Sequence, residues 1–94
     1  MLLRAARLPR PLFNAIAEGF EVDALWSRER VVLEFDSYAF HATRAAFERD
    51  RRRTAALQRG RYVVRRTTWR ELTRQPLALV ARTAEALASA PHRG

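Results

Sequence analysis

The sequence contains no cysteine and no lysine, and its 94 residues include only two histidines, His41 and His92. The absence of cysteine excludes disulfides, thiolate metal sites and cysteine nucleophiles, and the absence of lysine excludes Schiff-base chemistry. Two histidines are too few for a multi-histidine zinc site. The longest apolar run, Leu77 to Ala81, is far shorter than the roughly 20 residues of a membrane-spanning helix. We therefore expect a cytoplasmic protein with no membrane partner and no small-molecule cofactor.

Charge is abundant and unevenly distributed. All 18 basic residues are arginines, and with 10 acids they give a net charge of +8. Residues 18–36 contain six acids and two arginines, whereas residues 44–74 contain eleven arginines and three acids. An apolar content of 48% is enough for a small core, and the length fits one domain over residues 1–94. The charge separation favours a metal site beside a phosphate-binding surface over a uniformly basic tail.

The hydrophobic patterns predict an αβββαβα order of elements. The predicted elements are a helix end at residues 2–6, strands at 12–17, 20–26 and 31–36, a helix at 42–59, a strand beginning at 62–64 and a helix beginning at Pro76. Gly60 is expected to end the long helix as a C′ glycine. Three hairpin-linked strands, a crossover helix and a returning strand predict an α/β fold with a mixed sheet flanked by helices.

Four carboxylates lie on two of the predicted strands. Strand alternation places Glu21 and Asp23 on one face, opposite Phe20, Val22 and Ala24, and gives Glu34 and Asp36 a shared face in the next strand. A tight turn at residues 28–29 sets Asp23 against Glu34 and Glu21 against Asp36. Opposed like charges are destabilising, so solvent, an arginine or a bound cation must compensate them. Such a pair suits Mg²⁺, although a solvated sheet face would show the same pattern.

The predicted helix carries two charges within an apolar stripe. Ala46, Asp50, Arg53 and Leu57 follow the spacing of one buried helix face. A charge between apolar neighbours usually needs a partner. Asp50 and Arg53 either pair only with each other or contact the carboxylates of the strands and hold them in position.

A series of short motifs follows in order along the chain. They are Asp23-Ala-Leu-Trp, Val-Leu-Glu34-Phe-Asp36, His41, Asp50-Arg-Arg-Arg53, Gly60 and Val-Val-Arg-Arg-Thr67. In this order the motifs resemble a bacterial domain family related to very-short-patch-repair endonucleases. That family belongs to the restriction-endonuclease-like PD-(D/E)XK superfamily. The resemblance covers roughly residues 5–88 and implies a restriction-endonuclease-like αβββαβα core whose N-terminal helix is truncated.

The resemblance also implies roles for the acidic residues. Asp23 and Glu34 would be catalytic acids that bind Mg²⁺, and Asp36 stands at the lysine position of the superfamily's D…(D/E)-x-K signature. His41 or Asp36 would orient or deprotonate the attacking water. A lone histidine is, however, more often a surface or capping residue.

The basic residues complete the expected site. Asp50 and Arg53 match the family's Asp-x-x-Arg on the helix behind the acids. Phosphate contacts are expected from Arg51, Arg52, Arg65, Arg66 and Arg70. The leading hypothesis is a Mg²⁺-dependent endonuclease-like domain that hydrolyses phosphodiester bonds of DNA. The alternative is a catalytically inactive nucleic-acid-binding or interaction module of the same fold.

Overall fold

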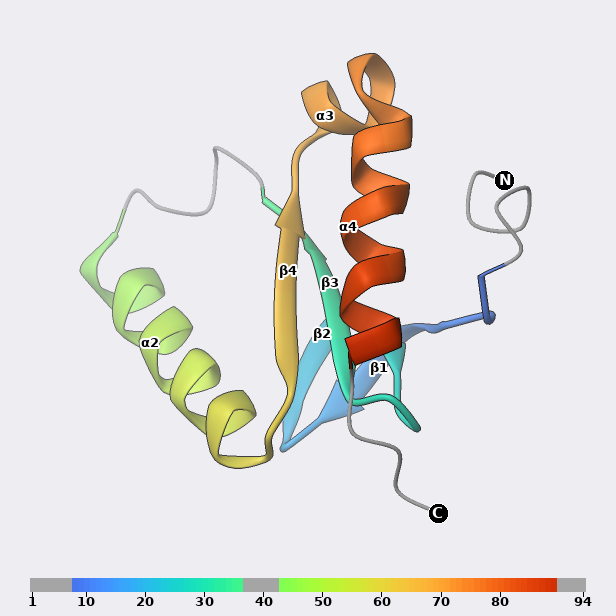
Figure 1. Ribbon diagram of the computed structural model, residues 1–94. Helices are drawn as coiled ribbons and strands as arrows, with labels where there is room; N and C mark the ends of the chain where they lie inside the picture. The colour runs from blue at the N-terminus through green and yellow to red at the C-terminus, as the bar shows by residue number, and fades with distance from the viewer. Residues whose placement is uncertain (1–7, 37–42, 90–94) are drawn as a thin grey trace.

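The computed structural model of the protein describes residues 8–36 and 43–89 (Figure 1). Its elements are β1 (Leu12–Ala17), β2 (Phe20–Trp26), β3 (Val31–Phe35), α2 (Arg44–Arg59), β4 (Val63–Thr67), α3 (Trp69–Arg74) and α4 (Pro76–Ser89). The sheet has the order β1-β2-β3-β4, in which β1, β2 and β3 are antiparallel neighbours and β4 pairs with β3 in parallel. The predicted α/β fold with a mixed sheet is confirmed. The predicted helix end at residues 2–6 lies outside the described residues.

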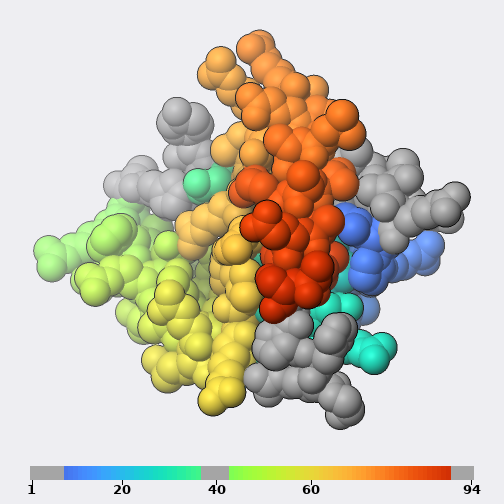
Figure 2. Space-filling view, viewed as in Figure 1, coloured from blue at the N-terminus to red at the C-terminus, as the bar shows by residue number. Residues whose placement is uncertain are grey.

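The two long helices cover opposite faces of the sheet. Val31 and Leu33 pack in one core cluster with Leu79 of α4, whereas Val32, between them in sequence, packs with Leu57 of α2. Successive side chains of a strand point to opposite faces. A strand buried on both faces needs an unbroken apolar run, which β3 has at residues 31–33. Figure 1 and Figure 2 show α2 and α4 on either side of β4.

The predicted register of the β2–β3 hairpin is confirmed. Leu33 pairs with Ala24, and the two following pairs keep the same register down to the turn. The next residues along this register are Asp23 and Glu34, which thus lie on neighbouring strands as expected.

The predicted shared face of Val22 and Ala24 is wrong. Val22 packs in the α2-side cluster, whereas Ala24 packs in the α4-side cluster. The alternation of β2 is broken opposite Asn14 of the edge strand β1, which has a φ of 51°, a left-handed conformation that asparagine tolerates better than most residues. The β1–β2 register is the same on both sides of this residue, in the pairs Phe13–Ala24 and Ala15–Val22, and the pair Asn14–Asp23 between them is missing.

Gly60 has a different role from the one predicted. It is the C-cap of α2 with a φ of −77°, and Arg61 takes the left-handed conformation with a φ of 63°. A Cβ atom at Gly60 would overlap the Glu18 carboxylate and lie 2.9 Å from Cε2 of Tyr62. Close packing against side chains of Glu18 and Tyr62, rather than a positive φ, therefore favours glycine here.

Helix α3 was not expected from the sequence. Thr68 is its N-cap, and its side chain accepts a hydrogen bond of 3.1 Å from the backbone N–H of Glu71. Thr68-x-x-Glu71 has the spacing of a capping box, a signal that could have located the helix. Glu71 also accepts a 2.7 Å hydrogen bond from Thr67 and pairs with Arg82, which joins α3 to α4. In the part of the chain that the structure describes, no helix is long and apolar enough to cross a membrane.

Candidate functional site

A cleft with a volume of about 380 Å³ lies where β2, β3 and β4 face α2. Its charged lining consists of five carboxylates and three arginines, which give a net charge of −2. These residues are Glu21, Asp23, Glu34, Asp36 and Asp50, with Arg49, Arg53 and Arg66. We call this the acidic cleft. It is a local concentration of negative charge in a protein whose net charge is +8.

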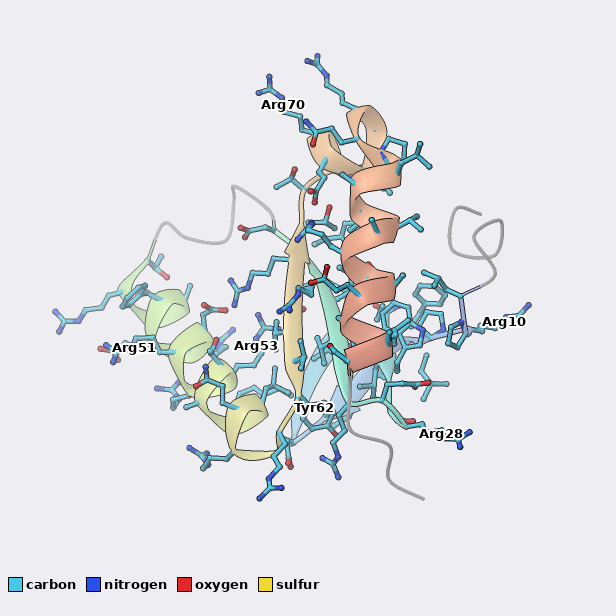
Figure 3. All side chains as sticks on the ribbon, viewed as in Figure 1. Arg10, Arg28, Arg51, Arg53, Tyr62 and Arg70 are labelled. Carbon is cyan, nitrogen blue, oxygen red and sulfur yellow. The ribbon has the colours of Figure 1, made fainter. Side chains whose placement is uncertain are left out.

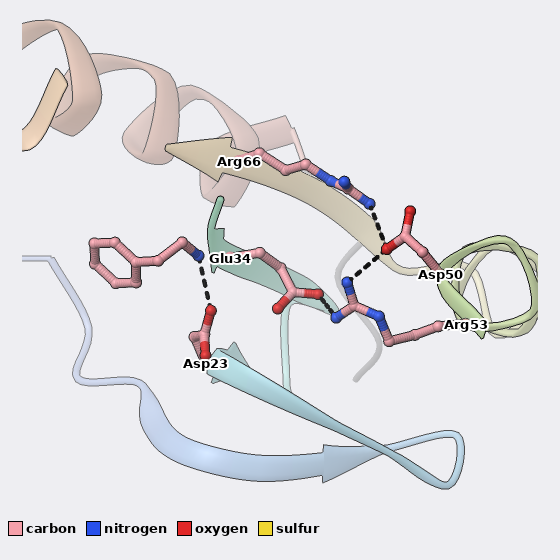
Figure 4. A network of polar contacts seen from close by, with 6 residues as sticks. Asp23, Glu34, Asp50, Arg53 and Arg66 are labelled. Carbon is pink, nitrogen blue, oxygen red and sulfur yellow. Dashed lines mark hydrogen bonds and ion pairs between the residues drawn. The ribbon is translucent and has the colours of Figure 1, made fainter. Parts of the chain in front are cut away.

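Glu34 is the buried acid of the cleft. It lies on β3 with only 6% of its surface exposed, a position where a carboxylate needs a partner. Arg53 of α2 supplies that partner, because its Nη1 forms an ion pair with Oε1 of Glu34 (Figure 4). Of the three forms of compensation expected for the acidic pair, an arginine is therefore present at Glu34.

Arg53 is shared between two carboxylates. Its Nη2 donates to Oδ1 of Asp50 at 3.0 Å, and the same oxygen lies 3.4 Å from Nη2 of Arg66 (Figure 4). Burial lowers the pKa of Arg53 from its ordinary value, the charge of Arg66 acts in the same direction, and Asp23 opposes both. The result is a chain of alternating charge from Glu34 to Arg66. Asp50 and Arg53 thus contact each other and also reach the strands.

Asp23 is held by the backbone of the neighbouring strand. Its Oδ2 accepts a 2.7 Å hydrogen bond from the N–H of Phe35. This side-chain contact joins β2 to β3 just beyond Ala24–Leu33, where the backbone pairing of the two strands ends. Asp36, the next residue, is tied to β4 by its own N–H, which donates to the carbonyl oxygen of Thr67 at 2.7 Å. These two bonds bring the carboxylates of β2 and β3 to one end of the sheet.

Two exposed aromatic rings lie beside this end of the sheet. The rings of Phe35 and Trp69 are 6.2 Å apart, and 42% of Phe35 and 73% of Trp69 are exposed. Phe35 also lines the acidic cleft, so the aromatic pair adjoins the carboxylates.

The predicted phosphate-binding arginines do not form one group. Arg66 lines the cleft, whereas Arg65 is its neighbour on β4 and extends from the opposite face of the sheet. Arg51 and Arg52 are exposed on α2, and Arg70 is exposed on α3, far from Arg53 (Figure 3). The five arginines are therefore spread over α2, β4 and α3.

Sequence reasoning missed Arg49, which lines the acidic cleft. It precedes Arg53 by one helical turn, and this spacing could have placed it on the same face. The predicted catalytic residue His41 lies outside the described residues.

The donors of the cleft agree with Mg²⁺ in their chemistry. Asp23 and Glu34 offer carboxylate oxygens, which Mg²⁺ prefers, and water commonly completes its coordination. Across residues 8–36 and 43–89, no group of three or more histidines and acids is placed to hold a metal ion. The agreement with Mg²⁺ thus lies in the type of donor atom, and in the structure described Glu34 is engaged by Arg53.

Comparison with known proteins supports the fold. No protein-family model matches the chain, and no curated protein matches it. The structure is similar to the catalytic domain of the homing endonuclease I-Bth0305I, with a TM-score of 0.67 and 15% sequence identity over 92% of this chain and 84% of that chain. The predicted restriction-endonuclease-like fold is thus confirmed, and the protein has the fold of an endonuclease catalytic domain.

Proposed function

We propose that this protein is a divalent-metal-dependent nuclease domain that hydrolyses phosphodiester bonds of DNA. The main observation in support is the acidic cleft, where Asp23 and Glu34 lie on neighbouring strands at one end of an endonuclease-like sheet. The net charge of −2 in the lining is the amount that one divalent cation neutralises. We further propose that the domain spans residues 1–94 and is related to very-short-patch-repair endonucleases, as its motifs suggest.

The residues of the acidic cleft would have different roles in hydrolysis. Asp23 and Glu34 would hold Mg²⁺, which would supply Lewis-acid polarisation of the phosphoryl group and activation of water. Asp36, anchored through its backbone to Thr67, would orient the attacking water or accept its proton. Arg49 and Arg66 would bind the phosphate oxygens, because guanidinium groups form paired hydrogen bonds with phosphate.

DNA contacts outside the cleft would depend on charge. Arg51, Arg52 and Arg70 are exposed and would bind phosphates of the backbone, which carry no sequence information. Affinity for DNA should therefore fall steeply as the salt concentration rises.

A plasmid-nicking assay tests this function. The purified protein should nick supercoiled DNA with Mg²⁺ and stop with EDTA, and Asp23→Asn should reduce the rate by about 100-fold or more, because a group that holds the metal is lost. Glu85→Gln changes an exposed acid of α4 and serves as the matched control with unchanged activity. Nicking by Asp23→Asn at the rate of the unmodified protein would contradict the proposal.

The alternative is a nucleic-acid-binding module of the same fold that has no catalytic activity. The observation that favours it is the Arg53–Glu34 ion pair, which already neutralises one of the two expected metal ligands. This alternative predicts salt-sensitive DNA binding that is indifferent to Mg²⁺ and to Glu34→Gln, with no nicking at any metal concentration.

A further inference from the structure

We infer that Arg53 is a built-in counter-ion of the acidic cleft, which a divalent cation must displace from Glu34. The inference rests on the proposed function in one respect, namely that the cleft is a metal site. It adds a role for a residue outside the ligand set. Arg53 would set how tightly the cleft binds metal and would keep Glu34 paired when no metal is bound.

The position of Arg53 creates the competition. Glu34 is 6% exposed, and Arg53 approaches it from α2 with 20% of its own side chain exposed. Asp23 also acts on Arg53, since its charge favours the protonated guanidinium. A metal ion on the same two acids would lie close to a permanent positive charge in a place that water screens poorly. The Glu34 carboxylate can thus pair with the guanidinium of Arg53 or bind the metal ion, and the guanidinium and the metal ion repel each other.

Asp50 makes the displacement feasible. Arg53 bonds Glu34 with Nη1 and Asp50 with Nη2, the latter at 3.0 Å. Asp50 and Arg53 lie three residues apart on one helix, so this contact is local, whereas the contact with Glu34 joins the helix to the sheet. When Glu34 binds a metal ion and its ion pair with Arg53 is broken, Arg53 keeps Asp50 as its partner and no unpaired guanidinium is left in the cleft.

Removal of the charge at residue 53 should therefore strengthen metal binding. We expect Arg53→Gln to bind Mn²⁺ at least about tenfold more tightly than the unmodified protein, because a positive charge within a few ångströms of the site is lost. Arg53→Lys retains the charge and should bind Mn²⁺ as the unmodified protein does. A merely structural role of Arg53 would make both variants bind the metal equally well or less well.

Isothermal titration of the full chain with Mn²⁺, without DNA, tests the inference. Arg59→Gln, an exposed arginine in the last turn of the same helix, is the matched control and should leave the affinity unchanged. If Arg53→Gln binds Mn²⁺ no more tightly than the unmodified protein, the counter-ion role is refuted while a metal-dependent nuclease remains possible. If no variant binds Mn²⁺, both proposals fail.

Thermal melting covers the case in which Arg53→Gln folds poorly. Glu34 loses its partner in this variant, so Mn²⁺ should raise the melting temperature of Arg53→Gln more than that of the unmodified protein. An equal or smaller increase would overturn the inference. Arg53→Lys provides the comparison at constant charge.

Discussion

The ion pair between Arg53 and Glu34 should contribute measurably to stability. Truncation of one partner of a buried pair costs about 3–5 kcal/mol, and because water reaches part of Arg53 we expect a cost at or below the lower end of this range, about 2–3 kcal/mol, for Arg53→Met. Glu34 is 6% exposed and Arg53 has 20% of its side chain exposed. In a domain of this size each kcal/mol changes the melting temperature by about 4–8 °C, so a decrease of roughly 10–20 °C is expected.

A double-mutant cycle separates this pair from other effects. Glu34→Gln leaves Arg53 bonded to Asp50 and should cost only about 1 kcal/mol, since no buried charge is left unpaired. The combined variant should be more stable than the sum of the two single changes predicts, by about 1–2 kcal/mol. Urea denaturation in EDTA measures all four proteins. Additivity within about 0.5 kcal/mol would refute the coupling.

Three further changes test other parts of the structure. Gly60→Ala should lower the free energy of unfolding by about 1–2 kcal/mol, because the new Cβ crowds Tyr62; unchanged urea denaturation would contradict this. Thr68→Ala removes the N-cap of α3 and should cost about 1 kcal/mol in thermal denaturation; an equal melting temperature would argue against the cap. Trp69 is 73% exposed and Trp26 is 2% exposed, so DNA binding should quench the tryptophan fluorescence of the unmodified protein but not that of Trp69→Phe, in which only Trp26 is left; quenching that persists in the variant would contradict the placement of Trp69.

The central strand and the helix face were predictable because local pattern and tertiary structure agree there. Residues 31–33 are continuously apolar and pack on both faces of the sheet, and the short turn at residues 28–29 agrees with the register of the three pairs up to Ala24–Leu33. On α2, the stripe from Ala46 to Leu57 brings Asp50 and Arg53 to the cleft. Hydrophobic spacing is sufficient to place such residues.

The remaining features depend on contacts that spacing does not encode. The change of face between Val22 and Ala24 lies opposite the left-handed Asn14 of the neighbouring strand, a tertiary pairing that the spacing within β2 does not reveal. Glycine at position 60 is favoured by the approach of the Glu18 and Tyr62 side chains, which tertiary packing brings there. Nor does the sequence decide whether solvent, arginine or metal compensates Glu34, because that depends on how far α2 lies from the sheet.

Crystallography with Mn²⁺ tests the central claim most directly. Anomalous scattering from crystals soaked in Mn²⁺ should show one peak in contact with the carboxylates of Asp23 and Glu34, with Arg53 bonded to Asp50 and no longer to Glu34. An intact Arg53–Glu34 ion pair and no peak in the acidic cleft, at a Mn²⁺ concentration that supports nicking, would contradict the account.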